Sequence, residues 1–307
     1  MTATPHASPP GPGGWPAAAF NWNLKGRVIA IDNGAVLARR NDFAELMALG
    51  ALSVITFDPA SHLHGAAAPA THPEFQLFNG VGLGNGAPAR LYACLDPAFS
   101  ASLAPLPAAR LPGNLQNALQ VLARLPLNTL KLDSIEGLSS VDWLILDDRH
   151  DSLGILEHAH SRLESVLLAQ LGCSFLPCHE GAADFGQLCH RMAQHGLAFY
   201  RFNSPQHLSR FPATLQLNAP RSSQLHSAQA LFVPTQARLE QMAPARRLKL
   251  AFIVDSAYGL HDLAYHLLAS VDQGQATTYL AARHYLAQVE DLATTFTLTA
   301  QYSPAPW

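Results

Sequence analysis

Short apolar runs alternate along this chain with polar, turn-forming segments, the pattern typical of an α/β protein. Three runs predict buried strands, and they are RVIAI at 27–31, SVITF at 53–57 and VDWLILD at 141–147. Helical spacing of apolar residues follows at 37–49 and from Ser152 to about Leu171. Strands that alternate with helices and carry apolar residues on both faces predict a parallel, doubly wound sheet.

The second half of the chain predicts one more strand and several helices. A helix is expected at 185–195, a strand at 197–202, and further helices at 244–255, 260–270 and 277–289. The resulting domain prediction has three parts: a Pro/Gly-rich arm at 1–17, a Rossmann-like domain at 18–203, and a helical C-terminal extension at 204–307.

Composition narrows the class of protein. The 307 residues are 49% hydrophobic and 13% charged, with a formal net charge of −3, which favours a compact domain and gives no reason to expect a nucleic acid or an anionic membrane as partner. No apolar run approaches the roughly 20 residues of a membrane span. The first residues carry neither the basic nor the apolar part of a secretory signal. With four scattered cysteines, we expect a reduced, cytoplasmic protein.

Acidic residues follow the first two predicted strands. The first strand leads into Asp32-Asn33-Gly34-Ala35, where glycine lets the backbone approach a bound molecule. The second strand ends at Asp58, and a carboxylate in that place suits a ribose diol because it accepts two hydroxyl protons. Asp and Gly are also common in turns without any ligand. Asp32 and Gly34 after one strand, together with Asp58 after the next at strand–helix–strand spacing, indicate a ligand site more strongly than either part alone.

The third strand ends in a cluster that is able to move a proton. Asp147, Asp148 and His150 follow it directly, and carboxylates and imidazole are the usual general bases. The alternative is structural: Asp148 and Asp151 cap the next helix and His150 lies at the surface. Both interpretations stay open at this point.

Metal and hydrolase chemistry have weaker support. Cys173, Cys178, His179, Cys189 and His190 lie near one another in the sequence, but without the Cys-x-x-Cys pair of a zinc site, and buried thiols explain them better. We therefore expect no metal. The chain contains neither a Gly-x-Ser-x-Gly nucleophile motif nor a phosphate-binding Gly-Lys-Ser/Thr loop after a strand.

The order of several weak motifs carries a family resemblance. IDNGA, VITFDP, TLKLDSI, VDWLILDDRHDSLGILEHA, SFLPCHEGAADF and HGLAFYRF occur in that order, and together they resemble the FkbM-type S-adenosylmethionine-dependent methyltransferases. The later SQLHSAQALFVP and LKLAFIVDSAYGLHDLAYHLL resemble an extension found in some bacterial members. The likeness runs from about Arg27 to Leu268.

The resemblance implies a class I methyltransferase sheet that binds S-adenosylmethionine and methylates a hydroxyl of a sugar, polysaccharide or secondary metabolite. Asp32, Asn33, Gly34 and Ala35, with Asp58, would hold the cofactor. Asp147, Asp148 and His150 would face a small-molecule or glycan acceptor. The C-terminal helices would serve the core, a homo-oligomer or a protein partner.

The sequence of the first loop also supports an alternative to the methyltransferase hypothesis, a protein that binds a partner and is not an enzyme. The family's loop has a second glycine, whereas this chain has Val36-Leu37-Ala38-Arg39, and Ile145 replaces a family lysine. The alternative is therefore a pseudo-enzyme that keeps the fold but binds a partner instead of performing catalysis. If Val36, Leu37 or Arg39 fills the cofactor pocket, the alternative is favoured.

Overall fold

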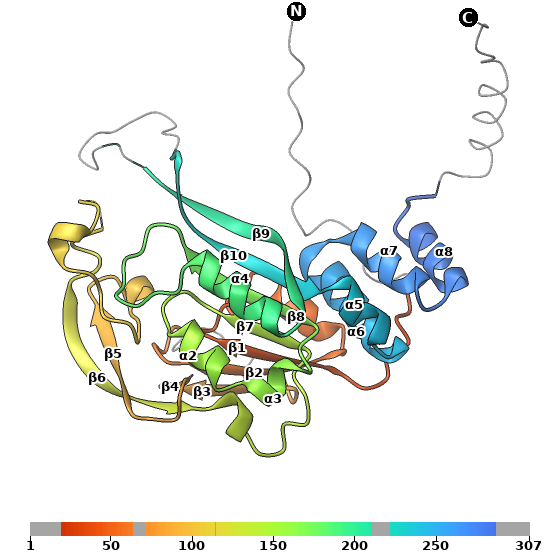
Figure 1. The fold of residues 1–307 in the computed structure, drawn as a ribbon, viewed down its shortest axis with the longest axis horizontal. Helices are drawn as coiled ribbons and strands as arrows, with labels where there is room; N and C mark the ends of the chain where they lie inside the picture. The colour runs from red at the N-terminus through yellow and green to blue at the C-terminus, as the bar shows by residue number, and fades with distance from the viewer. Residues whose placement is uncertain (1–19, 64–71, 114, 210, 212–221, 287–307) are drawn as a thin grey trace, which may run out of the picture. The chain divides into compact units, whose positions relative to one another are not determined.

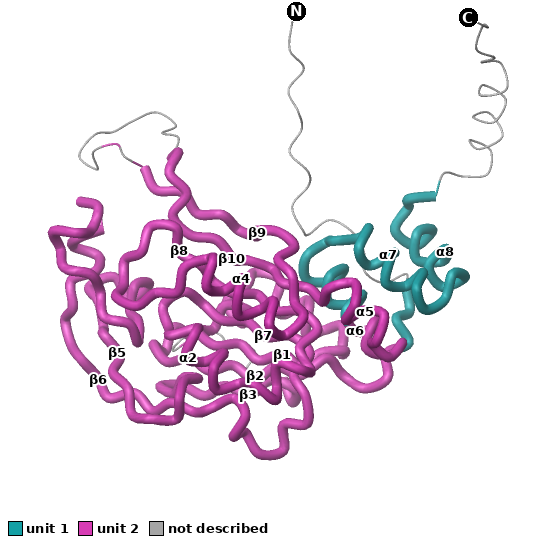
Figure 2. Tube along the Cα trace, viewed as in Figure 1, with its two compact units in different colours: residues 1–23, 250–307 teal, residues 24–249 magenta. Residues whose placement is uncertain are grey.

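The computed structural model describes residues 20–63, 72–113, 115–209, 211 and 222–286 (Figure 1). Two compact units divide the chain: a larger one at 24–249, and a smaller one formed by 1–23 together with 250–307 (Figure 2). The predicted arm at 1–17 lies outside the described residues.

A seven-stranded sheet organises the larger unit. Its strands are β1 (Val28–Asn33), β2 (Leu52–Asp58), β3 (Phe75–Asn79), β7 (Trp143–Leu146), β8 (Leu168–Ser174), β9 (Leu197–Leu208) and β10 (Gln224–Pro234). Their spatial order is β3-β2-β1-β7-β8-β10-β9. The first five are parallel in register, whereas β10 runs antiparallel to both β8 and β9.

This topology confirms the expected fold class. Numbered within the sheet, the strands run 3-2-1-4-5-7-6 with the seventh reversed. A parallel sheet that switches direction between its first and fourth strands is Rossmann-like, and the reversed seventh strand is the class I methyltransferase arrangement. Ligands of such sheets bind at the carboxyl ends of the strands beside the switch point, here β1 and β7.

The central strands form the core because both of their faces are covered. All four residues of β7, from Trp143 to Leu146, are at most 1% exposed, and six of the seven residues of β8 are buried. Removing one such side chain from water stabilises the fold by about 1.5–3 kcal/mol. These strands hold the ends that carry the candidate site.

The predicted helix from Ser152 to about Leu171 is wrong. The segment forms two short helices, α2 (Ser152–Glu157) and α3 (His160–Leu163), before β8 begins at Leu168. The run Val166 to Leu171 is apolar at every position but Gln170. Strands β7 and β10 pair along the two edges of β8, and residues 166–171 are all buried, so tertiary burial overrides helical spacing.

The first helix is also shorter than predicted. Helix α1 (Phe43–Ala48) begins six residues later than expected. Residues 36–38 donate their backbone N–H groups to the Asp32 carboxylate instead of entering a helix. Helix α4 (Phe185–Gln194) is confirmed, with Asp184 and Gln187 forming a capping box at its start.

A three-stranded sheet is inserted between β3 and β7. It contains β4 (Val81–Leu83), β5 (Ala89–Cys94) and β6 (Val121–Leu130), in the order β4-β6-β5. The loop from Cys94 to Val121 includes two short 3₁₀ turns, η2 (Pro97–Phe99) and η3 (Ala108–Arg110), and a third, η4 (Leu132–Ser134), follows β6. The loop returns to the main sheet, where Leu103 and Leu106 donate backbone hydrogen bonds to Arg149 and Cys178.

The last two strands extend well past residue 203, the expected end of the Rossmann-like domain. Strand β9 spans the expected boundary between 203 and 204, and β10 then lies between β8 and β9 in the main sheet. Helix α5 (Gln236–Gln241) and the start of α6 (Pro244–Tyr258) follow within the larger unit.

From residue 250 onward, the described part of the smaller unit is mainly helical. It contains the rest of α6, then α7 (His261–Ala269) and α8 (Gln273–Ala282). Asp255 is 4% exposed and accepts hydrogen bonds from Tyr279 and Arg283, which ties α6 to the end of α8. Within the described ranges, the helices are too short or too polar to cross a membrane.

Candidate functional site

The predicted ligand-binding residues meet at one edge of the sheet. Asn33, the last residue of β1, pairs in register with Phe57 of β2 and with Leu146 of β7. The three strands therefore end at the same level, and their carboxyl ends bring together the segments around Asp32, Asp58 and Asp147. This is the position at which doubly wound sheets hold ligands.

Asp32 closes its own loop. Its carboxylate accepts backbone hydrogen bonds from Val36 (2.8 Å), Leu37 (3.0 Å) and Ala38 (3.1 Å), and a weaker one from the Thr56 hydroxyl (3.4 Å). The side chain has no exposed surface. Burial raises the pKa of this carboxyl to about 6, although the backbone hydrogen bonds act in the opposite direction. Asp32 therefore stabilises the loop.

Gly34 and Ala35 bend the chain tightly after β1. Both have positive φ, +95° and +54°, a conformation that glycine adopts without strain. A Cβ at Gly34 would stand 2.5 Å from Cγ of Asp147, so the glycine lets the carboxylate that follows β7 lie against the first loop. The Arg39 guanidinium folds back onto this bend and donates to the carbonyls of Ala35 (3.1 Å) and Gly34 (3.4 Å).

Asp58 has a comparable structural role after β2. Its two carboxylate oxygens accept the backbone N–H groups of His62 (2.9 Å) and Leu63 (2.8 Å). Each oxygen has one protein partner and a carboxylate oxygen accepts two, so Asp58 keeps acceptor capacity on both oxygens, whereas Oδ2 of Asp32 already takes three donors. Burial, with help from the Arg39 and Arg149 charges, lowers the pKa of His62, which is therefore neutral at pH 7.

Unpaired polar atoms gather at this edge. Among the described residues, eight buried side-chain polar atoms have no hydrogen-bond partner. Five of them belong to this region: Asn33 Nδ2, His62 Nε2, Asp147 Oδ2, Arg149 Nη1 and His150 Nε2. Leaving a buried polar atom unpaired costs about 1–3 kcal/mol. Such a concentration at the carboxyl ends of β1, β2 and β7 is typical of a site that a polar ligand completes.

His150 is buried instead of lying at the surface. The backbone N–H of Ser102 donates to its Nδ1 at 3.3 Å, and the Ser102 hydroxyl lies 2.9 Å from the same atom. Nδ1 therefore carries the lone pair and Nε2 the proton, which points at Asp147 Oδ2 from 3.6 Å. The surface interpretation of His150 is wrong, and its ring joins the inserted loop to the end of β7.

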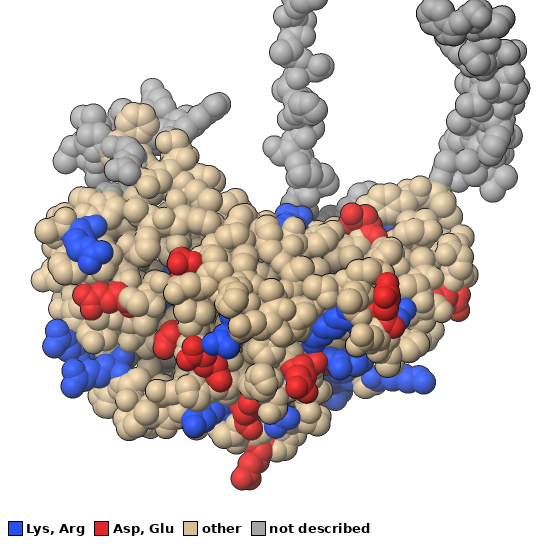
Figure 3. Space-filling view, in the orientation of Figure 1, with Lys and Arg blue, Asp and Glu red and all other residues tan. Residues whose placement is uncertain are grey.

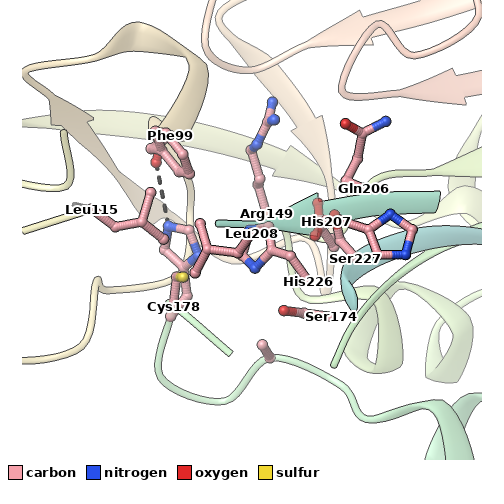
Figure 4. Close-up of a pocket in the computed structure, with 13 residues that line it drawn as sticks. Phe99, Leu115, Arg149, Ser174, Cys178, Gln206, His207, Leu208, His226 and Ser227 are labelled. Carbon is pink, nitrogen blue, oxygen red and sulfur yellow. Dashed lines mark hydrogen bonds between the residues drawn. The ribbon is translucent and has the colours of Figure 1, made fainter. Parts of the chain in front are cut away.

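A cavity of about 280 Å³ opens beside this cluster, at the ends of β8, β9 and β10 (Figure 4). Asp148 and Arg149 line it from the end of β7, and Ser174 from the end of β8. His226 and Ser227 line it from β10. Phe99, Leu115 and Leu208 supply apolar wall. A few polar groups placed among apolar ones are characteristic of small-molecule pockets.

Close packing holds the chain between β7 and the cavity. A Cβ at Gly172 of β8 would lie 2.5 Å from the backbone nitrogen of Asp148. Only glycine therefore lets the backbone that follows β7 lie this close to β8. Ser152 also donates its hydroxyl to the Asp147 carbonyl at 3.0 Å. These contacts fix where the Asp148 and Arg149 side chains begin.

The charge of Arg149 reaches both parts of the edge. It contributes to lowering the pKa of His62 beside β2 and also the pKa values of His179 and His226 at the cavity, although burial is the larger cause at each. Arg149 therefore stands between the cluster at β1 and β2 and the cavity at β8 and β10.

The described residues contain no group of three or more His, Cys, Asp or Glu side chains placed to hold a metal ion.

Burial raises the pKa of the Cys173 thiol to about 12 and that of Cys178 to about 11. On the face drawn in Figure 3, Lys and Arg are interspersed with Asp and Glu.

Sequence reasoning located this edge but assigned its side chains incompletely. Of the predicted catalytic residues, Asp148 lines the cavity, while Asp147 and His150 are buried beside it. Arg149 lies between predicted residues and could have been found from its position. His226 gave no signal, because it reaches the site through an irregularity in a strand that we had expected to be part of a helical extension.

No family model matches the chain, and no curated protein sequence matches it. Solved structures that are similar at a low level include two methyltransferases. One is a magnesium protoporphyrin IX methyltransferase from Synechocystis PCC 6803 with bound SAM, with 10% identity over 69% of this chain and 72% of that chain and a TM-score of 0.32. The other is a 16S rRNA (adenine(1408)-N(1))-methyltransferase from Catenulisporales acidiphilia, with 11% identity over 69% of this chain and 89% of that chain and a TM-score of 0.30. Similarity at this level does not establish a family.

Proposed function

We propose that the chain is an S-adenosylmethionine-dependent methyltransferase that methylates a hydroxyl of a sugar, polysaccharide or secondary metabolite. One observation carries the proposal: five buried polar atoms at the carboxyl ends of β1, β2 and β7 make no hydrogen bond to any described residue, and two of them, Asp147 Oδ2 and His150 Nε2, face each other at 3.6 Å. The fold is one that serves this chemistry, and the FkbM resemblance of the sequence points the same way.

The residues present fit the cofactor in part. Asn33 Nδ2 and His62 Nε2 are unpaired groups with which the polar atoms of a nucleoside or amino acid would pair. Asp58 retains acceptor capacity for a ribose diol. Asp32, Gly34 and Ala35 shape the loop instead of offering side-chain atoms. When bound, the cofactor supplies a methyl group on a sulfonium, which leaves the protein to position the acceptor and remove its proton.

Among the candidate bases, Asp148 is best placed to meet an acceptor. It lines the cavity and is the one Asp or Glu among the described residues that do so. His150 is held by Ser102 at Nδ1 and faces Asp147 at Nε2, so this pair positions the turn that carries Asp148. Asp148 would accept a hydrogen bond from the acceptor hydroxyl and take its proton as methyl transfer proceeds.

The closed first loop supports the second candidate, a pseudo-enzyme that binds a partner. Asp32 is fully buried and bound to three backbone donors of its own loop, and the Arg39 guanidinium donates to the carbonyls of Gly34 and Ala35. If this arrangement is permanent, the cofactor has no access to the loop. The chain would then bind a protein partner or a second copy of itself through the C-terminal helices.

Isothermal titration with S-adenosylmethionine and S-adenosylhomocysteine tests the proposal. We expect micromolar binding, about 8 kcal/mol. Arg39→Ala removes the side chain that folds over the loop, and Arg90→Ala, at an exposed position on β5, is the matched control. Binding gained only in Arg39→Ala would mean that Arg39 closes a working site. No heat at millimolar ligand in the wild type and in Arg39→Ala would refute the methyltransferase proposal and favour the pseudo-enzyme.

A further inference from the structure

Arg149 and His226 line the cavity at the ends of β8, β9 and β10, and each side chain carries a buried polar atom with no hydrogen-bond partner among the described residues. Arg149 Nη1 is a buried donor without an acceptor in the described part of the chain, and His226 Nδ1 is likewise unpaired. A guanidinium remains charged at all physiological pH values, and a charged donor without an acceptor is more costly than a neutral one. The group that best satisfies it is a carboxylate or phosphate, whose two oxygens match the fork of the guanidinium.

The placement of His226 is built into the sheet. The register between β9 and β10 shifts between Leu225 and Ser227, which leaves His226 as the extra residue of a β-bulge. Its carbonyl accepts the backbone N–H groups of Phe175 (2.8 Å) and Leu176 (3.2 Å), so the bulge is anchored to the end of β8. Bulges redirect side chains and occur often beside active sites. Figure 4 shows His226 and Arg149 among the side chains around the cavity.

The described polar residues that line the cavity are one cation, one carboxylate and several neutral side chains. Arg149 is the one Arg or Lys, and Asp148 the one Asp or Glu, among the described residues that line it. Burial lowers the pKa values of His179 and His226, so both are neutral at pH 7. His179 donates its Nε2 proton to the Phe99 carbonyl at 3.3 Å, which leaves a lone pair on Nδ1. The cavity therefore offers one cationic anchor and several groups suited to hydroxyls.

From this arrangement we infer that the cavity binds a small hydroxylated acid, with its carboxylate or phosphate on Arg149 and a hydroxyl on Asp148. The volume of about 280 Å³ is at the small end for ligand pockets and suits a single sugar ring. The inference rests on the proposed function only in making this ligand the methyl acceptor. The acid group and its contact with Arg149 are tested without the cofactor.

Titration calorimetry of the full chain with three probes tests the inference: glucuronate, glucose 6-phosphate and glucose. The first two present the two oxyanions on the same ring, and glucose is the neutral reference. We expect at least one of the acids to bind tenfold or more tightly than glucose. Whether glucuronate or glucose 6-phosphate is the tighter ligand distinguishes a carboxylate site from a phosphate site.

Variants assign the preference to Arg149. Arg149→Gln should remove the tenfold preference for the acid, Arg149→Lys should keep part of it, and Arg90→Gln, which removes the same charge at an exposed position, should leave it unchanged. The inference is overturned if no acid binds, if wild-type chain binds glucose as tightly as the acids, or if folded Arg149→Gln keeps the preference. Acid binding without S-adenosylmethionine binding would leave the cavity assignment standing while the proposed function fails.

Discussion

Gly34→Ala tests the close contact between the first loop and the end of β7. A methyl group at this position would stand 2.5 Å from Cγ of Asp147, against the 3.5–4.0 Å of an ordinary contact. The positive φ of +95° adds backbone strain of about 1 kcal/mol. Overpacking a buried site costs a further 1–3 kcal/mol or so. The free energy of unfolding should therefore fall by about 2–4 kcal/mol.

Gly50→Ala is the matched control. Gly50 has a φ of +67°, and a Cβ there would meet no atom within 4 Å, so this variant carries the backbone cost of about 1 kcal/mol alone. Urea-induced unfolding followed by circular dichroism measures both variants. In the double variant Gly34→Ala/Asp147→Ala, the space left by the carboxylate should recover much of the excess loss. Equal losses in Gly34→Ala and Gly50→Ala would refute the close contact.

Three further predictions concern buried polar groups. The pKa of Asp32 is raised from 3.8 to about 6, so between these pH values the folded chain holds a proton that the unfolded chain has lost. The free energy of unfolding, measured in urea, should therefore fall by about 3 kcal/mol as the pH rises from about 4 to 6. The Asp32→Asn variant should lack this fall. The carboxylate of Asp142 is 3% exposed and lies 2.7 Å from Lys249 Nζ, so Lys249→Met leaves it without its cation. Thermal and urea unfolding should show a free energy of unfolding lower by about 3 kcal/mol. A loss below about 1 kcal/mol would contradict a buried pair. A thiol reagent should modify the partly exposed Cys189 first, whereas Cys173, fully buried with its pKa raised to about 12, should react only on unfolding; mass spectrometry of partly labelled protein reads the order.

The sequence predicted the strands that carry their own signal. Strands β1, β2 and β7 were predicted from apolar runs with an Asp at or next to the end of the strand, and their carboxyl ends do meet. Strand β8 was missed because an apolar run such as Val166 to Leu171 fits a buried helix as well as a strand. Strand β10 was missed because its place between β8 and β9 depends on pairing across the chain, which local spacing does not encode.

The candidate site residues were likewise only partly predictable from the sequence. Acidic residues at strand ends were visible, but their partners were not: the sequence gives no sign that Asp32 and Asp58 would be used by the backbone of their own loops. The burial of His150 depends on Ser102, 48 residues earlier. Of the three predicted catalytic residues, Asp148 is the one that lines the cavity, and its catalytic role stays a prediction.

Strand β9 has a consequence for how copies of the chain interact. Within the described residues it is one of the two edges of the seven-stranded sheet, and a long open edge is a template on which another chain can pair and aggregate. Here the register shifts between Arg201 and Phe199 and again between Gln206 and Asn203, where Ser204 has a φ of +47° and Pro205 lacks an N–H donor. The irregularities that shape the pocket wall thus also interrupt the edge, so that it resists growth into a continuous intermolecular sheet.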